Sequence, residues 1–113
     1  MHVADLDGVS FADGNGWRAT VTVAVHDADG APVPDATVTV SGWLDGAYWR
    51  TETCTTDGEG QCSLTTPKIH HRKTSATATV DDVTHVTFTY QPTDNYDPDC
   101  DSDGTTGTVS RPW

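Results

Sequence analysis

Residues 17–26 alternate strictly between two kinds of side chain, and this alternation constrains the fold more than any other feature. Val21, Val23 and Val25 fall on one side of an extended chain, and small or polar residues fall on the other. Successive side chains of a strand point to opposite faces of the sheet. We therefore predict that this segment is a strand with one face buried.

Further short segments of this kind follow, separated by turns rich in Gly, Pro and Asp. No segment has helical periodicity, so the pattern predicts an all-β, antiparallel β-sandwich of seven or eight strands. The 113 residues suit a single domain over 1–113. The other expected strands are 2–10, 36–41, 48–55, 61–66, 74–80, 84–90 and 105–111, with a hairpin around Asp57-Gly58, a turn at Asp81-Asp82, and Val86, Phe88 and Tyr90 facing the core.

Segment 92–104 carries the densest negative charge in the chain, and we interpret it as a functional loop. Four of its five aspartates lie within seven residues with no basic residue nearby, so they repel one another unless a cation neutralises them. Ca²⁺ prefers oxygen ligands, and the pattern Asp-x-Asp-x-Asp-Gly is typical of the start of a calcium loop. Gly104 would allow the sharp turn. The predicted ligands are Asp97, Asp99, Asp101 and Asp103.

The calcium loop is incomplete, because Ser110 stands where an EF-hand would place its bidentate Glu. The remaining ligands must come from elsewhere. We expect Asp5 and Asp7 in the amino-terminal segment; Asp13 and Asn15 are the alternative if an extra strand separates the two acidic segments. The competing interpretation of the acidic segment is a solvated tail, and that of the amino-terminal aspartates is charge protecting an edge strand.

The net charge of −11 limits the partners of this chain. It argues against nucleic acids and against anionic membranes, because both bind through an excess of Lys and Arg. It suits cations and solubility. No apolar run approaches the length of a membrane span or a signal-peptide core, so we expect no membrane insertion, and any leader would belong to a longer parent protein.

Two of the three cysteines flank a turn-rich spacer. Cys54 and Cys62 lie on either side of the expected hairpin, where they could face each other and form a disulfide. Such a bridge implies an oxidising, extracellular setting and would add ~2.5 kcal/mol of stability. The spacing fits no zinc site, and two reduced thiols are the alternative. Cys100 lies in the acidic segment, as a free thiol or an intermolecular partner.

Aromatic residues gather around the segment 43–49. Trp43, Tyr48 and Trp49 could stack on sugar rings, with Asp45 and Arg50 binding hydroxyl groups, which would make the chain a carbohydrate-binding module. The alternative is that these rings fill the core or cap its edge.

Segment 68–73 holds three of the six basic residues together with His70 and His71, in an otherwise acidic chain. It could bind an acidic partner or an anionic polysaccharide. The two histidines would point to opposite faces of a strand, so they form a poor metal pair. A solvated loop is the alternative.

The segments 21–40, 55–65 and 74–90 together resemble bacterial immunoglobulin-like domains of the invasin and intimin type. The ends, His2–Gly8 and Asp97–Pro112, are similar to modules appended to secreted bacterial proteases and other hydrolases. The resemblance implies an immunoglobulin-like sandwich without catalytic residues, and no nucleophile or metalloprotease motif stands in the chain. We expect a monomeric, calcium-stabilised extracellular accessory module for spacing, stabilisation or adhesion, with a polysaccharide or cell-surface partner.

Overall fold

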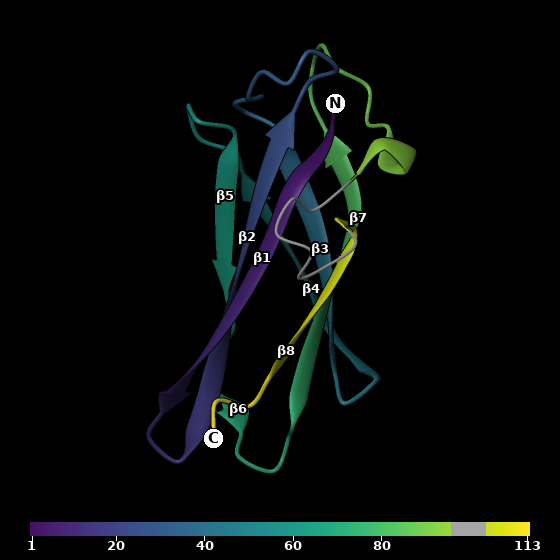
Figure 1. Ribbon diagram of the computed structural model, residues 1–113. Helices are drawn as coiled ribbons and strands as arrows, with labels where there is room; N and C mark the ends of the chain where they lie inside the picture. Colours follow the sequence, from purple (N-terminus) through teal and green to yellow (C-terminus); the bar gives the residue numbers. More distant parts are fainter. Residues whose placement is uncertain (96–103) are drawn as a thin grey trace.

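The computed structural model describes residues 1–95 and 104–113, which form two antiparallel sheets packed face to face (Figure 1). The predicted β-sandwich is confirmed, with eight strands in the described residues. The first sheet has the order β1 (His2–Asp13), β2 (Gly16–His26), β5 (Gln61–Thr65), and the short β6 (Ile69–His70) also pairs with β2. The second has the order β4 (Ala47–Thr55), β3 (Thr37–Leu44), β7 (Ser75–Thr84), β8 (Thr106–Ser110), and a 3₁₀ turn, η1 (Pro92–Asp94), precedes β8.

β2 shows why the alternating sequence forms this sandwich. Val23 and Val25 are buried, and Val21 packs against the same core cluster. On the other face, Thr20 and Thr22 exchange hydroxyl hydrogen bonds with Thr65 and Ser63 of β5, at 3.0 and 2.9 Å. One face of the strand is therefore stabilised by apolar burial, about 1.5–3 kcal/mol for each fully buried Val, and the other by cross-strand polar pairs.

The core consists of two hydrophobic clusters. The larger is built mainly from valines of both sheets, including Val3, Val25 and Val38. The smaller surrounds Trp17, which is fully buried, and includes Ile69 of β6. Partly buried Leu44, Trp49 and Val109 pack against this second cluster.

The predicted turn at Asp81-Asp82 and the predicted strand 84–90 are both wrong. β7 continues without interruption to Thr84, and its pairing with β3 shifts register between Thr39 and Val40, leaving Asp81 as an extra residue. Beyond Thr84 the chain is irregular until η1, and Val86 is 100 % exposed. The ring of His85 accepts a hydrogen bond from the Thr87 backbone, which competes with strand pairing. Phe88 is also exposed, and of the three residues predicted to face the core only Tyr90 packs against it.

The predicted hairpin around Asp57-Gly58 is also corrected. β4 pairs with β3 and β5 pairs with β2, so the chain crosses from one sheet to the other between them. Asp57 shapes this crossing, because its Oδ1 accepts hydrogen bonds from the backbones of Glu59 and Gln61. Alternation of side chains predicts which face of a strand is buried, but it does not identify the neighbouring strand.

The molecule is elongated, with extents of 43 × 23 × 22 Å. Its amino and carboxyl termini lie at opposite ends of the long axis (Figure 1). The part of the chain that the structure describes contains no helix long and apolar enough to cross a bilayer.

Candidate functional site

Asn95 lies in segment 92–104, two residues before Asp97, and joins three parts of the chain. Its side-chain oxygen accepts a hydrogen bond from the Val3 backbone at 2.7 Å. Its side-chain nitrogen donates to the Tyr90 hydroxyl at 2.6 Å and to Thr105 Oγ1 at 3.0 Å. Since Thr105 follows the acidic segment, the contact between Asn95 and Thr105 holds together the described residues on either side of it.

The amino terminus lies in the same place. The Met1 ammonium group donates to the Thr89 carbonyl at 2.8 Å, and the Gln91 backbone donates to the Met1 carbonyl at 2.8 Å. Together with Asn95, these contacts form a terminal clamp between residues 1–3 and 89–95. Burial is the largest influence on the pKa of Tyr90 and raises it above its usual value, so the hydroxyl group stays protonated. Sequence reasoning missed Asn95, because nothing in the sequence sets it apart from other loop asparagines.

The aspartates predicted to bind calcium fall into two groups. Asp97, Asp99, Asp101 and Asp103 lie outside the described residues, as does Cys100. Asp5 and Asp7 lie on β1, opposite Ala24 and Thr22 of β2, and both are half-buried. Within residues 1–95 and 104–113, no group of three or more His, Cys, Asp or Glu is placed to hold a metal ion. Gly104 has a φ of 81°, a backbone conformation that glycine adopts readily.

The alternative ligands Asp13 and Asn15 lie far from the clamp. Asp13 is ten residues beyond Val3 along one strand, a distance of roughly 33 Å in extended chain. Its carboxylate is also paired with Arg18 at 2.5 Å, and this hydrogen bond lowers the Asp13 pKa. Asp5 and Asp7 are therefore closer to the described flank of the acidic segment than the alternative pair.

The predicted disulfide between Cys54 and Cys62 is present, with Cα atoms 5.8 Å apart. Because Cys54 lies on β4 and Cys62 on β5, the bond connects the two sheets rather than the two arms of a hairpin. Cys62 is buried and Cys54 packs against the valine-rich cluster. The bond therefore fixes the sheet-to-sheet distance at one edge of the core.

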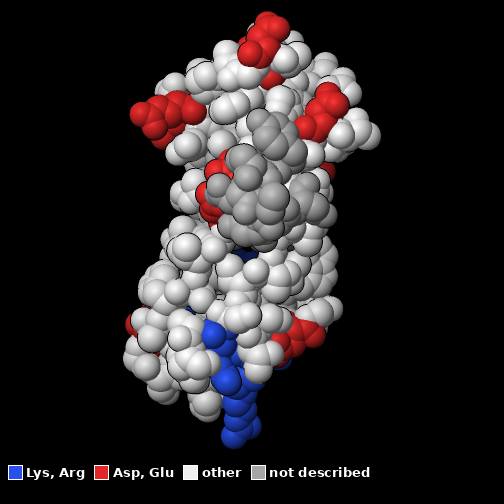
Figure 2. Space-filling model, in the orientation of Figure 1, with Lys and Arg blue, Asp and Glu red and all other residues white. Residues whose placement is uncertain are grey.

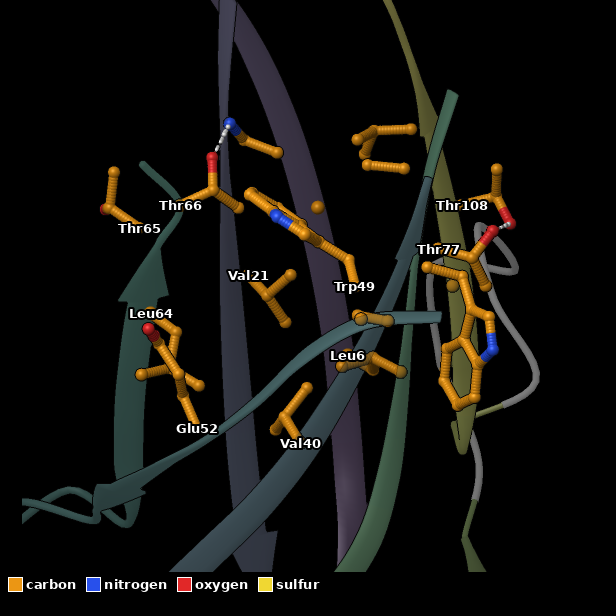
Figure 3. A pocket seen from close by; sticks show the side chains of 18 of the residues that line it. Leu6, Val21, Val40, Trp49, Glu52, Leu64, Thr65, Thr66, Thr77 and Thr108 are labelled. Carbon is orange, nitrogen blue, oxygen red and sulfur yellow. Dashed lines mark hydrogen bonds between the residues drawn. The ribbon is translucent and has the colours of Figure 1, made fainter. Parts of the chain in front are cut away.

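Trp49 is half-buried and packs against the smaller core cluster, whereas Tyr48 is exposed. β4 pairs with β3 through Arg50–Gly42 and Tyr48–Trp43, so Trp49 is the extra residue of a β-bulge. The bulge directs its ring between the sheets, where it lines a cavity of about 110 Å³ (Figure 3). The cavity is mainly apolar, and the side chains around it include Leu6, Val21, Val40 and Leu64.

The polar groups beside this cavity interact with one another. Arg50 forms an ion pair with Glu52, and its guanidinium lies 5.6 Å from the centre of the Trp49 ring. This ion pair uses one nitrogen of the Arg50 guanidinium group that was predicted to bind sugar hydroxyls. Arg50, Glu52 and the nearby Asp7 include no nucleophile with an adjacent general base. The cavity lies between the two core clusters, because residues that belong to or pack against each of them line it.

Trp43 and Tyr48 form a separate aromatic pair. Their rings meet edge to face with centroids 5.9 Å apart, and Tyr48 is 62 % exposed. The Tyr48 hydroxyl bonds Thr51 Oγ1 at 2.8 Å, and Thr51 bonds Ser41 at 2.9 Å. Thr77 of β7 lies opposite Trp43 of β3, and its hydroxyl bonds the Thr108 hydroxyl of β8 at 2.9 Å (Figure 3). Two of the three predicted aromatics are thus neighbours on a surface rich in hydroxyl groups.

Asp45 was predicted to bind sugar hydroxyls, but it has a structural role. In the tight turn between β3 and β4, where Asp45 has a φ of 49°, its Oδ1 accepts hydrogen bonds from the Thr74 hydroxyl at 2.8 Å and the Ser75 backbone at 2.9 Å. The hydrogen bond from the Thr74 hydroxyl is the largest cause of a lowered pKa at Asp45. The carboxylate ties this turn to the start of β7.

Comparison with known protein families identifies a bacterial family. The profile of a family described as "Bacterial Ig-like domain (group 1)" matches residues 6–93, from within β1 to within η1. No curated protein and no solved structure matches the chain.

Proposed function

Because the chain belongs to the bacterial Ig-like domain (group 1) family, we propose that it is a calcium-stabilised extracellular accessory module of a larger secreted bacterial protein. The family is non-catalytic, and its domains are often found in extracellular or surface proteins. We propose that this chain likewise has no enzymatic activity, and that it spaces, stabilises or attaches its parent protein.

The single observation that carries the proposal is how the amino-terminal end of the sandwich is held. The terminal clamp fixes the start of β1, and the disulfide connects the sheets at the same end of the molecule. With termini at opposite ends of a 43 Å axis, a rigid sandwich in line with its neighbours would separate them by about its own length. A disulfide is stable mainly in oxidising compartments, which supports the extracellular setting.

Calcium stabilisation rests on the spacing of Asp97, Asp99, Asp101 and Asp103, and on the residues that flank them. The contact between Asn95 and Thr105 brings the two described flanks together. Four carboxylates within seven residues of sequence repel one another unless a cation neutralises them. Ca²⁺ would remove that repulsion and use the carboxylates as ligands, with Asp5 or Asp7 as further donors from β1.

The expected gain follows from mass action. Binding to the folded state alone adds about 2.7 kcal/mol when free Ca²⁺ is a hundred times the dissociation constant. Extracellular modules bind Ca²⁺ with dissociation constants of roughly 0.1–1 mM. The test compares thermal unfolding in millimolar CaCl₂, in MgCl₂ and in chelator. A higher Tm in CaCl₂ alone is expected; equal midpoints in all three would remove calcium from the proposal.

Carbohydrate binding is the second candidate function, and the Trp43–Tyr48 pair is the observation that favours it. An exposed ring next to hydroxyl groups offers both an apolar surface for a sugar face and hydrogen-bonding partners. The test is retention on a panel of insoluble polysaccharides. Trp43→Ala should abolish retention and Trp49→Phe should leave it intact; if the wild-type chain is retained on no glycan, this candidate fails.

A further inference from the structure

The basic residues of this acidic chain gather at one end of the molecule. This basic end comprises segments 13–18, 44–47, 66–75 and 110–113, which hold five of the six Lys and Arg residues and two acidic residues, an excess of three positive charges. The opposite end, formed by segments 27–36, 56–60 and 85–95, holds six acidic residues and no Lys or Arg. Figure 2 shows the basic side chains at the lower end and acidic ones at the upper end. The five basic residues are Arg18, Lys68, Arg72, Lys73 and Arg111.

The distance between the two ends decides what a partner experiences. The molecule is 43 Å long, whereas charges in solution are screened over about 8 Å at physiological ionic strength. A molecule that touches the basic end is therefore attracted by the local positive charge and hardly repelled by the distant carboxylates. The net charge of −11 consequently does not prevent this end from binding an anion.

Within the basic end, the backbone of residues 68–73, called the basic segment, is held in place by the fold. Ile69 is 1 % exposed and pairs with Trp17 of β2, and the Trp17 indole donates to the Lys73 carbonyl at 3.1 Å. His70 closes the turn between Ile69 and Lys73. Its carbonyl accepts a hydrogen bond from the Lys73 backbone at 3.0 Å, and its ring accepts one from the Arg72 backbone at 3.1 Å. The exposed side chains therefore extend from a backbone that is already ordered, which lowers the entropic cost of binding.

Flat rings lie among these cations. Trp113 is 56 % exposed, and the Arg111 guanidinium lies 5.4 Å from the centre of its ring. Arg111 also donates to the His71 carbonyl at 2.9 Å, which connects the carboxyl terminus to the basic segment. The rings of His70 and His71 stack with centroids 4.3 Å apart, instead of pointing to opposite faces as predicted, because β6 ends at His70.

We propose that the basic end binds an acidic polysaccharide. Lys68, Arg72 and Lys73 would pair with carboxylate or sulfate groups, and Trp113 would stack on a sugar face. The combination of cations with an exposed ring favours a charged sugar over a simple anion. The proposal rests on the extracellular setting proposed above, where acidic glycans are the abundant polyanions. A nucleic acid, or the acidic end of a second copy of this chain, is the competing partner.

The test is affinity electrophoresis through gels that contain hyaluronan, dextran sulfate or neutral dextran, run in CaCl₂ and again in chelator. One or both anionic polymers should retard the wild-type chain and dextran should not; the two anionic gels distinguish carboxylate from sulfate recognition. Retardation should weaken as salt rises from about 0.05 M to about 0.5 M. The electrophoresis in chelator is independent of the melting experiment. A chain that is not retarded by the anionic gels would therefore not contradict the proposed calcium stabilisation.

Two variants with equal net charge separate a local site from the overall charge. Lys68→Gln/Arg72→Gln should weaken binding roughly fivefold or more. Thr53→Asp/Thr55→Asp makes the same change in net charge at exposed positions of β4 and should bind like the wild type. Trp113→Ala should weaken binding without changing the charge. The proposal would be overturned by an equal loss of binding in both double variants, or by equal retardation in the dextran gel. It would also be overturned by tighter binding to single-stranded DNA than to either acidic glycan, or by self-association that requires the acidic end.

Discussion

The backbone N–H of Val3 donates a 2.7 Å hydrogen bond to Oδ1 of Asn95, across 92 residues of sequence. This bond places the beginning of the first strand beside Asn95, two residues before the first of the four clustered aspartates in the acidic segment. Asn95 also bonds Tyr90 and Thr105, so one side chain connects the amino-terminal strand with both described flanks of that segment. The stability of the terminal clamp should therefore depend on Asn95 more than its position in a loop suggests.

Asn95→Ala should lower the free energy of unfolding by about 1–3 kcal/mol, because it leaves the Val3 N–H and the Tyr90 hydroxyl without this partner. Urea unfolding followed by tryptophan fluorescence measures the change. Asn15→Ala, at an exposed position of the β1–β2 turn, is the matched control and should change stability by less than about 0.5 kcal/mol. Similar losses in both variants would show that the clamp has no special role.

Neutralising the acidic segment should separate repulsion from calcium binding. Asp99→Asn/Asp101→Asn should raise Tm in chelator, since two repelling charges are gone, and abolish the rise in Tm on adding CaCl₂. Asp27→Asn/Asp29→Asn removes the same charge from the β2–β3 turn and should keep the calcium response. Differential scanning calorimetry checks both, and a calcium response that survives in the first variant contradicts the assignment of these ligands.

Loss of the disulfide between Cys54 and Cys62 should destabilise the sandwich by ~2.5 kcal/mol, on the chain-entropy estimate for a short loop. Cys54→Ala/Cys62→Ala should shift the urea midpoint downward at unchanged slope. A phosphine reductant should shift the wild-type chain in the same direction and leave the double variant unaffected. If the reductant moves neither protein, the bond makes no contribution to stability.

Asp45 should make stability depend on pH in the acid range. Its pKa is lowered in the folded state, first by the Thr74 hydroxyl, so its contribution is complete above the unfolded pKa of about 3.9 and is lost as pH falls through the lower folded value. The difference in Tm between wild type and Asp45→Asn should therefore be largest above about pH 5 and shrink toward pH 2.5. Thr74→Val should flatten the same profile; an unchanged profile would assign the effect to other carboxylates.

The two neighbouring tryptophans should respond differently to truncation. Trp49→Ala opens the space between the sheets further and should cost about 2–4 kcal/mol. Trp43→Ala removes a half-buried ring that, unlike Trp49, does not pack against a core cluster, and should cost about 1 kcal/mol or less. Thermal unfolding of the two variants measures this order. The reverse order would mean that Trp49 is dispensable for packing and free to bind a ligand.

Much of the fold could be predicted from the sequence, because alternation reports burial directly. β2 was expected over 17–26 and extends over Gly16–His26, with its three valines toward the core. The pairing of Cys54 with Cys62 was also predicted correctly, although for a hairpin. Both predictions depend only on residues that lie close together in the sequence, so the sequence pattern was enough to make them.

The errors arose where alternation occurs without a partner strand. Residues 84–90 have the composition of a strand, but β8 pairs with β7 directly and leaves them no place in the sheet. The position of Trp49 depends on a bulge, which reverses a side chain's direction without a recognisable residue pattern. Asn95 was missed for a similar reason, because its role depends on its hydrogen bonds. One partner, Val3, is far away in the sequence, and nothing in the sequence marks the other, Thr105, as a partner.

The placement of the termini determines how the sandwich would respond to mechanical force. β1 starts at one end and runs the length of the molecule against β2, and β8 runs toward the other end against β7 (Figure 1). Tension applied between the termini acts along these strands. The hydrogen bonds of each outer strand would then be sheared together rather than broken one after another, so the domain should extend little before it yields.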